Sequence, residues 1–172
     1  MVLNRKVSHL NDQVKDHHVF HPGDKVPMSA GLQKGPSDDY QNIMMEKPVS
    51  ELVSKKSFLF VLPSDSVEKV VQILQKEKQS AVLVIQHERL MGIVSKRDLL
   101  RRTAGSEAKL AHVKALEVMT ANPEVVKAAD PLSFAVNKMA MGGFRHLPVL
   151  SEEGEPIGII SIQDVLSFLA QL

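Results

Sequence analysis

The stretch GIVSKRDLL, residues 92–100, recurs in altered form as GIISIQDVL, residues 158–166. Both copies read glycine, two apolar residues, serine, two variable residues, aspartate and an apolar pair. The two copies begin 66 residues apart, at Gly92 and Gly158. This spacing is longer than a single strand or helix, so it indicates a duplicated unit of supersecondary structure. The chain is therefore expected to contain two copies of one small fold.

The duplication extends upstream of each copy. A shift of 65 residues places FVLPSDSVEKVVQIL, residues 60–74, over VVKAADPLSFAVNKM, residues 125–139. Asp65 then falls on Asp130, and we expect each to cap the helix that follows it, with Pro131 at a first helical position. The apolar residues of both helices have the i, i+3, i+4, i+7 spacing of a core-facing stripe. They are Val67, Val70, Val71 and Leu74 in the first copy, and Leu132, Ala135, Val136 and Met139 in the second.

Two short apolar runs follow each predicted helix. The first is AVLVI from Ala81 in one copy and HLPVL from His146 in the other, and the second begins at Gly92 or Gly158. The second runs align with a shift of 66 residues rather than 65. The second copy therefore has one extra residue in the turn between its two apolar runs, where insertions cost least. Each copy thus reads strand, helix, strand, strand, helix. This order predicts an α/β (α+β) fold of two three-stranded units, packed through their sheets with pseudo-twofold symmetry.

The first 45 residues have a different texture, with scattered apolar residues in no sustained period and turn signals at HPGD and KGPSDD. We expect a polar, partly ordered arm over residues 1–45. The first unit is then expected at residues 46–108 and the second at residues 109–172.

The composition limits the partners of the chain. The 21 Lys and Arg residues nearly balance the 20 Asp and Glu residues, which gives no overall attraction to nucleic acid or to a membrane. No cysteine is present, and no apolar run approaches the length of a membrane span. We expect a cytoplasmic protein with neither a nucleic acid nor a membrane as partner.

The duplicated stretch, together with the hydrophobic-Pro-Val strand at Leu147, Pro148 and Val149, resembles the CBS domain. Val53 and Val118 add a further match ahead of the first strands, and the resemblance covers about residues 46–172. CBS domains occur as tandem pairs, called Bateman modules, that bind AMP, ADP, ATP or S-adenosylmethionine in clefts between their sheets. The resemblance implies a regulatory sensor of an adenosine nucleotide and not an enzyme. It also implies a homodimer, with its output in an unidentified protein target or in its own assembly state.

The resemblance assigns ribose binding to Asp164 and Asp98, and places Ser161 and Ser95 near ribose or phosphate. Ser-x-x-Asp before an apolar helix is also the signature of a capping box. The two interpretations are compatible, because a helix N-terminus suits phosphate and a carboxylate can accept hydrogen bonds from both ribose hydroxyls.

The two clefts are expected to differ in charge. Arg145 and His146 open the strand that leads to Pro148, and an arginine there can bind phosphate through charge-assisted bonds. Their counterparts in the first copy are Ser80 and Ala81. The Asp98 cleft therefore depends on Lys96, Arg97 or a partner subunit for positive charge. The alternative is that Arg145 and His146 are ordinary surface residues ahead of an edge strand.

The resemblance also implies adenine contacts on the opposite repeat. For the Asp164 cleft these are Ser57, Leu59 and Gln79. For the Asp98 cleft they are Asn122, Glu124 and Phe144, and the acidic Glu124 departs from what an anionic nucleotide favours.

Other functions stay open on the sequence alone. The ligand could be S-adenosylmethionine or NAD, or the pair could be a ligand-free module for dimerisation or partner docking. A metal-dependent enzyme that uses His17, His18 and His21 beside Asp16 is the least favoured, because their spacing fits no familiar site. We therefore expect no metal site and no catalytic residue. Four cations at Lys96, Arg97, Arg101 and Arg102 fit a solvated helix face, because no stacking aromatic residues accompany them.

Overall fold

The computed structural model describes residues 36–53, 58–103 and 110–172, with the backbone alone for residues 36–38. Several predictions lie outside them: most of the arm, its histidines His17, His18 and His21, and the adenine contact Ser57.

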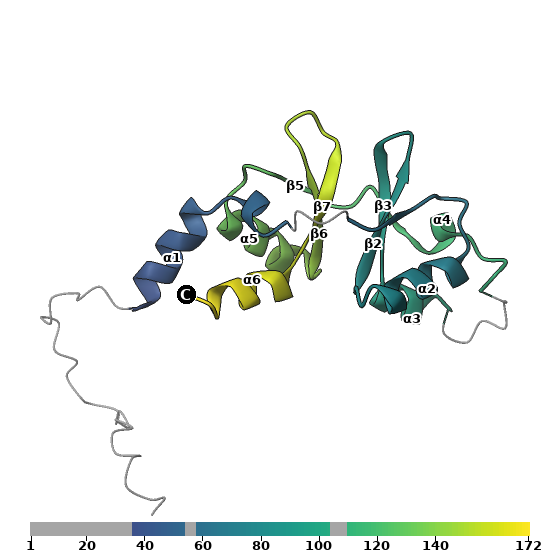
Figure 1. The fold of residues 1–172 in the computed structure, drawn as a ribbon, viewed down its shortest axis with the longest axis horizontal. Helices are drawn as coiled ribbons and strands as arrows, with labels where there is room; N and C mark the ends of the chain where they lie inside the picture. Colours follow the sequence, from purple (N-terminus) through teal and green to yellow (C-terminus); the bar gives the residue numbers. More distant parts are fainter. Residues whose placement is uncertain (1–35, 54–57, 104–109) are drawn as a thin grey trace, which may run out of the picture. The chain divides into compact units, whose positions relative to one another are not determined.

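The predicted order of strand, helix, strand, strand, helix is confirmed in both repeats (Figure 1). The first repeat consists of β1 (Phe60–Val61), α2 (Val67–Lys76), β2 (Ala81–Gln86), β3 (Arg89–Ser95) and α3 (Lys96–Thr103). The second consists of β5 (Val126–Lys127), α5 (Leu132–Gly142), β6 (His146–Leu150), β7 (Pro156–Ser161) and α6 (Ile162–Leu169).

Each repeat has its own mixed sheet. In the first, β1 pairs in parallel with β2, and β2 pairs antiparallel with β3. In the second, β5, β6 and β7 repeat this arrangement. The expected α+β class is confirmed. The first sheet has one strand more than expected, because β4 (Thr120–Ala121) pairs antiparallel with β3.

The predicted helix stripes form the centres of two cores. Val67, Val70 and Leu74 of α2 are at most 1% exposed in the first core, and Leu132, Ala135 and Met139 of α5 are at most 3% exposed in the second. A third cluster joins the repeats: buried residues of β2 and β3, among them Leu83 and Ile93, pack with Ile159 of β7. Lys34–Leu172 accordingly form one compact unit.

The segment that precedes each repeat packs on the core of the other repeat. The 3-10 helix η1 (Val49–Glu51) belongs to the second core, where Val49 is fully buried, and its N–H donates to Asp130 O at 2.8 Å. In the matching exchange, α4 (Ala115–Val118) belongs to the first core, and the Ala115 N–H donates to Asp65 O at 2.7 Å. This reciprocal exchange stabilises each repeat through residues that precede the other.

Two glycines of the duplicated motif permit this exchange. A Cβ on Gly158 would overlap Val53, and a Cβ on Gly92 would meet Met119 Sδ at 2.6 Å. Since Val53 and Met119 lie in the exchanged segments, the glycines are needed for close approach of a crossing chain.

Helix α1 (Pro36–Glu46) spans the expected boundary between the arm and the first unit at residue 45. It lies beside α5, and Met44 packs against the second core (Figure 1). This part of the predicted arm therefore contributes to the core of the second repeat.

The prediction that Asp65 and Asp130 cap helices is wrong. Asp65 Oδ2 instead accepts the N–H of Leu62 at 2.8 Å, and Asp130 Oδ2 accepts that of Lys127 at 2.8 Å. Each aspartate thus closes the turn before its helix. The N-cap of α2 is Ser66, whose side chain accepts from the Lys69 N–H. The N-cap of α5 is Pro131, one position before the expected first helical residue, and it offers no side-chain bond.

Candidate functional site

Ser161 and Asp164 form a capping box at the start of α6. The backbone N–H and the hydroxyl of Ser161 donate to Asp164 Oδ2 at 2.7 and 2.6 Å. In return, the Asp164 N–H donates to Ser161 Oγ at 3.2 Å. The motif thus satisfies backbone donors that a helix N-terminus leaves without intrahelical partners.

The first repeat has the same arrangement at the start of α3. Asp98 Oδ2 accepts from the Ser95 N–H at 2.9 Å and from its hydroxyl at 2.5 Å, and the Asp98 N–H donates to Ser95 Oγ at 3.2 Å. The expectation that both motifs cap helices is confirmed.

Each box occupies one carboxylate oxygen and leaves the other available. Within the described part of the chain, neither Asp98 Oδ1 nor Asp164 Oδ1 has a hydrogen-bond partner. Asp164 is exposed, and Asp98 is half-buried. A carboxylate oxygen offers two acceptor positions, so each aspartate can cap its helix and still accept bonds from a ligand.

Arg145 and His146 lie beside the second capping box. His146 pairs with Ser161 in the β6–β7 ladder, and the Arg145 carbonyl accepts the N–H of Ile162, the first residue of α6, at 3.0 Å. The Arg145 side chain is exposed. A guanidinium at this place can reach an anion near the α6 N-terminus, where the helix dipole also favours negative charge.

His146 is half-buried, and its Nε2 lies 2.7 Å from Ser80 Oγ of the first repeat. Burial holds the pKa of His146 below its ordinary value of 6.5, and the positive charge of Arg145 acts in the same direction. The carboxylates of Asp164 and Asp98 oppose this shift of the His146 pKa. The lowered pKa favours the neutral form of His146, so Arg145 supplies most of the positive charge that was expected from this pair.

The first repeat places Ser80 where the second has Arg145. The Ser80 carbonyl accepts the Lys96 N–H at 2.9 Å, as the Arg145 carbonyl accepts that of Ile162. The backbone geometry is thus repeated while the charge is not. The two cations expected to serve the Asp98 cleft, Lys96 and Arg97, are the first residues of α3, and both are exposed.

The structure describes three of the expected adenine contacts, Leu59, Gln79 and Asn122, and shows no hydrogen bond between them and the capping boxes. Leu59 is half-buried against the first core, and Gln79 is exposed after α2. Asn122 has a positive φ of 45°, a conformation that asparagine tolerates better than most residues. None of these side chains bonds to Asp98 or Asp164 within the described residues.

Two further residues qualify the expectations for the Asp98 cleft. The Glu124 carboxylate receives a bond from Lys138 Nζ at 2.9 Å, so its negative charge is partly offset. Phe144 packs against the second core. Sequence reasoning did not identify Ser80 as a site residue, although the repeat alignment matched it to Arg145.

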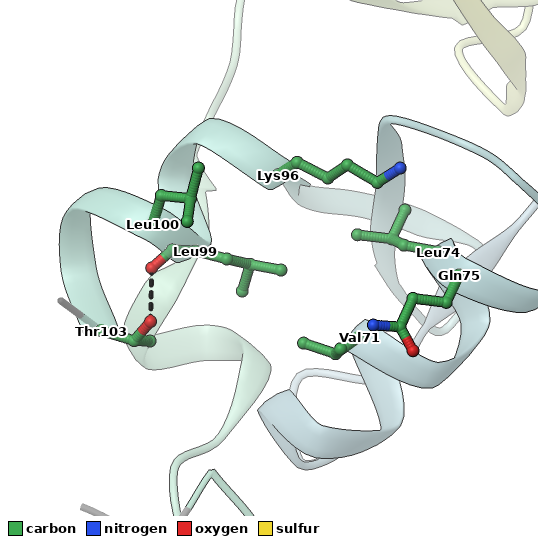
Figure 2. Close-up of a pocket in the computed structure, with 7 residues that line it drawn as sticks. All are labelled: Val71, Leu74, Gln75, Lys96, Leu99, Leu100 and Thr103. Atoms are coloured by element: carbon green, nitrogen blue, oxygen red, sulfur yellow. Dashed lines mark hydrogen bonds between the residues drawn. The ribbon is translucent and has the colours of Figure 1, made fainter. Parts of the chain in front are cut away.

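A separate open pocket of about 300 Å³ lies between α2 and α3 (Figure 2). Its lining is mostly aliphatic, and Thr103 turns its hydroxyl toward Leu99 O at 2.6 Å. Lys96 is the one predicted site residue in it, and no carboxylate faces it. The pocket therefore lacks the carboxylate that the expected ribose site uses. Its lining residues are Val71, Leu74, Gln75, Lys96, Leu99, Leu100 and Thr103.

No group of three or more metal-binding side chains occurs in residues 36–53, 58–103 and 110–172. Over the same ranges, no helix combines the length and the apolar character needed to cross a bilayer.

Comparison with known proteins identifies the repeats. The family model for the CBS domain matches residues 43–105 and 113–171. The CBS domain-containing protein CBSCBSPB1 of Arabidopsis thaliana is 31% identical over 104 residues, which are 60% of this chain and 19% of that protein. The chain thus spans less than a quarter of that relative's length.

Solved structures agree with this match. One is a CBS domain protein from Pyrobaculum aerophilum, complexed with AMP, with a TM-score of 0.64 and 26% sequence identity. The alignment covers 73% of this chain and 100% of that chain. CBSX2 in complex with AMP has a TM-score of 0.62 at 27% identity and covers 72% of this chain and 96% of its own. The duplicated motif, the two sheets and the family match lead to one conclusion: this chain belongs to the CBS domain family, with two CBS domains in tandem.

Proposed function

We propose that this protein is a regulatory sensor that binds an adenosine nucleotide (AMP, ADP or ATP) in clefts centred on Asp164 and Asp98, and that it catalyses no reaction. Occupancy is relayed to a protein target or to the assembly state of the chain. The observation that carries the proposal is the pair of capping boxes, each with one carboxylate oxygen available to a ligand. Two related structures hold AMP, which supports this ligand class.

The charges favour a phosphorylated ligand in the Asp164 cleft. Arg145 supplies an exposed cation beside Ser161, and the α6 N-terminus adds partial positive charge. S-adenosylmethionine is cationic and gains nothing from Arg145. NAD carries phosphates, and its larger size makes it a useful comparison in a binding screen.

A ligand-free docking module is the second candidate. The observation in its favour is that the capping boxes alone account for every Ser-x-x-Asp residue. Under this alternative the available carboxylate oxygens bind only water, and no nucleotide stabilises the fold.

We further propose a cytoplasmic homodimer. Leu100 of α3 and Leu166 of α6 occupy equivalent positions in the two repeats, and these residues are 73% and 58% exposed. Exposed leucines at equivalent positions of both repeats suit a symmetric interface, in which the same surface serves both subunits. Leu100→Lys with Leu166→Lys should shift sedimentation toward monomer, whereas Gln86→Lys, at an exposed strand end, should leave it unchanged. Equal sedimentation of all variants would contradict the homodimer proposal, and imaging of the tagged full chain would test the location.

A thermal-shift screen with AMP, ADP, ATP, NAD and S-adenosylmethionine tests the function. A ligand that binds only the folded state raises the unfolding temperature, by an amount that grows with its concentration over its Kd. The proposal predicts stabilisation by at least one of AMP, ADP and ATP, which exceeds that by S-adenosylmethionine. If no nucleotide raises the unfolding temperature, the docking module is the better account.

A further inference from the structure

Ser80 and His146 make a polar contact between the two repeats. Ser80 directly precedes β2, where Ala81 pairs with Ser95 of the first capping box. His146 pairs with Ser161 of the second box. The contact between Ser80 Oγ and His146 Nε2, 2.7 Å long, therefore connects the strand ends that flank both boxes.

The surroundings of His146 place it between opposite charges. Arg145 on β6 is its positive neighbour, while Asp164 on α6 and Asp98 on α3 both act on it with negative charge. Its partners on β7 and ahead of β2, Ser161 and Ser80, are uncharged. Carboxylates of both clefts thus influence a single imidazole.

A serine partner can keep this ring in place in either charge state. Neutral imidazole has one nitrogen that donates and one that accepts, whereas imidazolium donates from both. The Ser80 hydroxyl can donate to Nε2 or accept from it, so the contact survives protonation. The ring can gain a charge without losing its position.

We infer that Ser80 is a positioning residue for His146, and that this one imidazole adjusts the affinity of both clefts for anionic ligands through its protonation. This inference rests on the proposed function. Protonation of His146 adds a positive charge near both carboxylates, which favours a phosphate more than an uncharged nucleoside. One extra unit charge near the phosphate is expected to strengthen AMP binding about fivefold over adenosine binding.

The first experiment needs no ligand. The His146 ring of the full chain is titrated by NMR in wild type, Ser80→Ala and Ser80→Thr, with His146→Gln to assign its signals. Because the bond from the charged imidazolium to the hydroxyl is stronger than the bond to the neutral ring, its loss in Ser80→Ala should lower the pKa of His146. The tautomer ratio of the neutral ring should also change, about twofold to tenfold, while threonine, which keeps the hydroxyl, restores both values. A purely structural role for Ser80 would leave both values alone. Equal tautomer ratios and pKa values in Ser80→Ala and wild type would overturn the positioning role.

The second experiment measures AMP and adenosine affinity by calorimetry from pH 7.5 to pH 5.5. A phosphate monoester takes up a proton near about pH 6, so His146→Gln serves to subtract the titration of AMP itself. The preference of wild type for AMP over adenosine should rise with falling pH relative to His146→Gln. Parallel pH profiles would overturn the role of protonation.

If wild type binds no nucleotide at any pH, the proposed function is wrong, and the ligand-linked part of this inference is wrong with it. The ligand-free titration still decides whether Ser80 positions His146.

Discussion

The Val49 N–H donates to the Asp130 carbonyl at 2.8 Å, and this bond ties the start of the first CBS repeat to the second. Its counterpart joins Ala115 to Asp65. Because each repeat completes the core of the other, the two domains should unfold as one cooperative unit. We expect a conformational change in one repeat to reach the other through these backbone bonds and buried side chains, which the proposed sensor function needs.

The exchange predicts the effect of filling the space at Gly158. Gly158→Ala should lower the free energy of unfolding by about 1–3 kcal/mol, because the new Cβ overlaps Val53. Val53→Ala removes the overlapping methyl groups, so the double variant should lose less stability than the sum of the single losses. Denaturant unfolding of the four proteins measures this coupling. Strictly additive losses would show that the two residues do not press on each other.

Arg145 should affect AMP far more than adenosine. Arg145→Ala removes a charge-assisted partner of phosphate, worth about 1.5–3 kcal/mol, so AMP affinity should fall about tenfold to hundredfold. Adenosine affinity should change little, because its ribose and adenine contacts remain. Calorimetry with both ligands measures the difference, and Lys96→Ala provides a matched removal of a cation at the other box. Equal losses for AMP and adenosine in Arg145→Ala would exclude phosphate contact by this residue.

His146 should make stability depend on pH in a defined direction. Burial lowers its pKa in the folded state below 6.5, so below that pH the unfolded chain binds a proton more readily than the folded one. The contribution of His146 to the free energy of unfolding is therefore fully present above pH 6.5. It is lost as the pH falls from 6.5 toward the lower pKa of the folded state. The stability advantage of wild type over His146→Gln should therefore shrink between pH 7 and pH 5.5 in urea unfolding.

The control for this pH dependence is His112→Gln, at an exposed position. The stability difference between wild type and His146→Gln is compared with the difference between wild type and His112→Gln over the same pH range. If wild type and His146→Gln keep a constant difference in stability down to pH 5.5, His146 is not neutralised by folding.

The repeat register predicted the strands and helices because short-range periodicity determines which faces are buried. It did not predict the exchanged segments: η1 and α4 are short, and their positions depend on contacts with residues far along the chain. The capping error at Asp65 has a local cause. An aspartate can cap a helix or close the preceding turn, and Ser66, one residue later, was also able to cap α2.

The candidate site was predicted in part. The sequence identified Ser161, Asp164 and their counterparts, because a capping box has a fixed spacing that the repeat displays twice. It could not reveal the contact between Ser80 and His146, which depends on how the two sheets meet. It also treated His146 as a cation, because burial of an imidazole leaves no trace in the residues next to it.

Calorimetric titration of AMP into wild type, Asp164→Asn and Asp98→Asn tests the central claim most directly. Asparagine keeps one side-chain oxygen for the N–H of the capping serine and replaces the other oxygen with an NH₂ donor, so it preserves the cap and removes a ribose acceptor. The account predicts that Asp164→Asn stays folded and loses AMP affinity about tenfold to hundredfold, while Asp98→Asn retains the tighter site. Unchanged AMP affinity in folded Asp164→Asn would contradict the account and leave the duplicated motif as a helix cap alone.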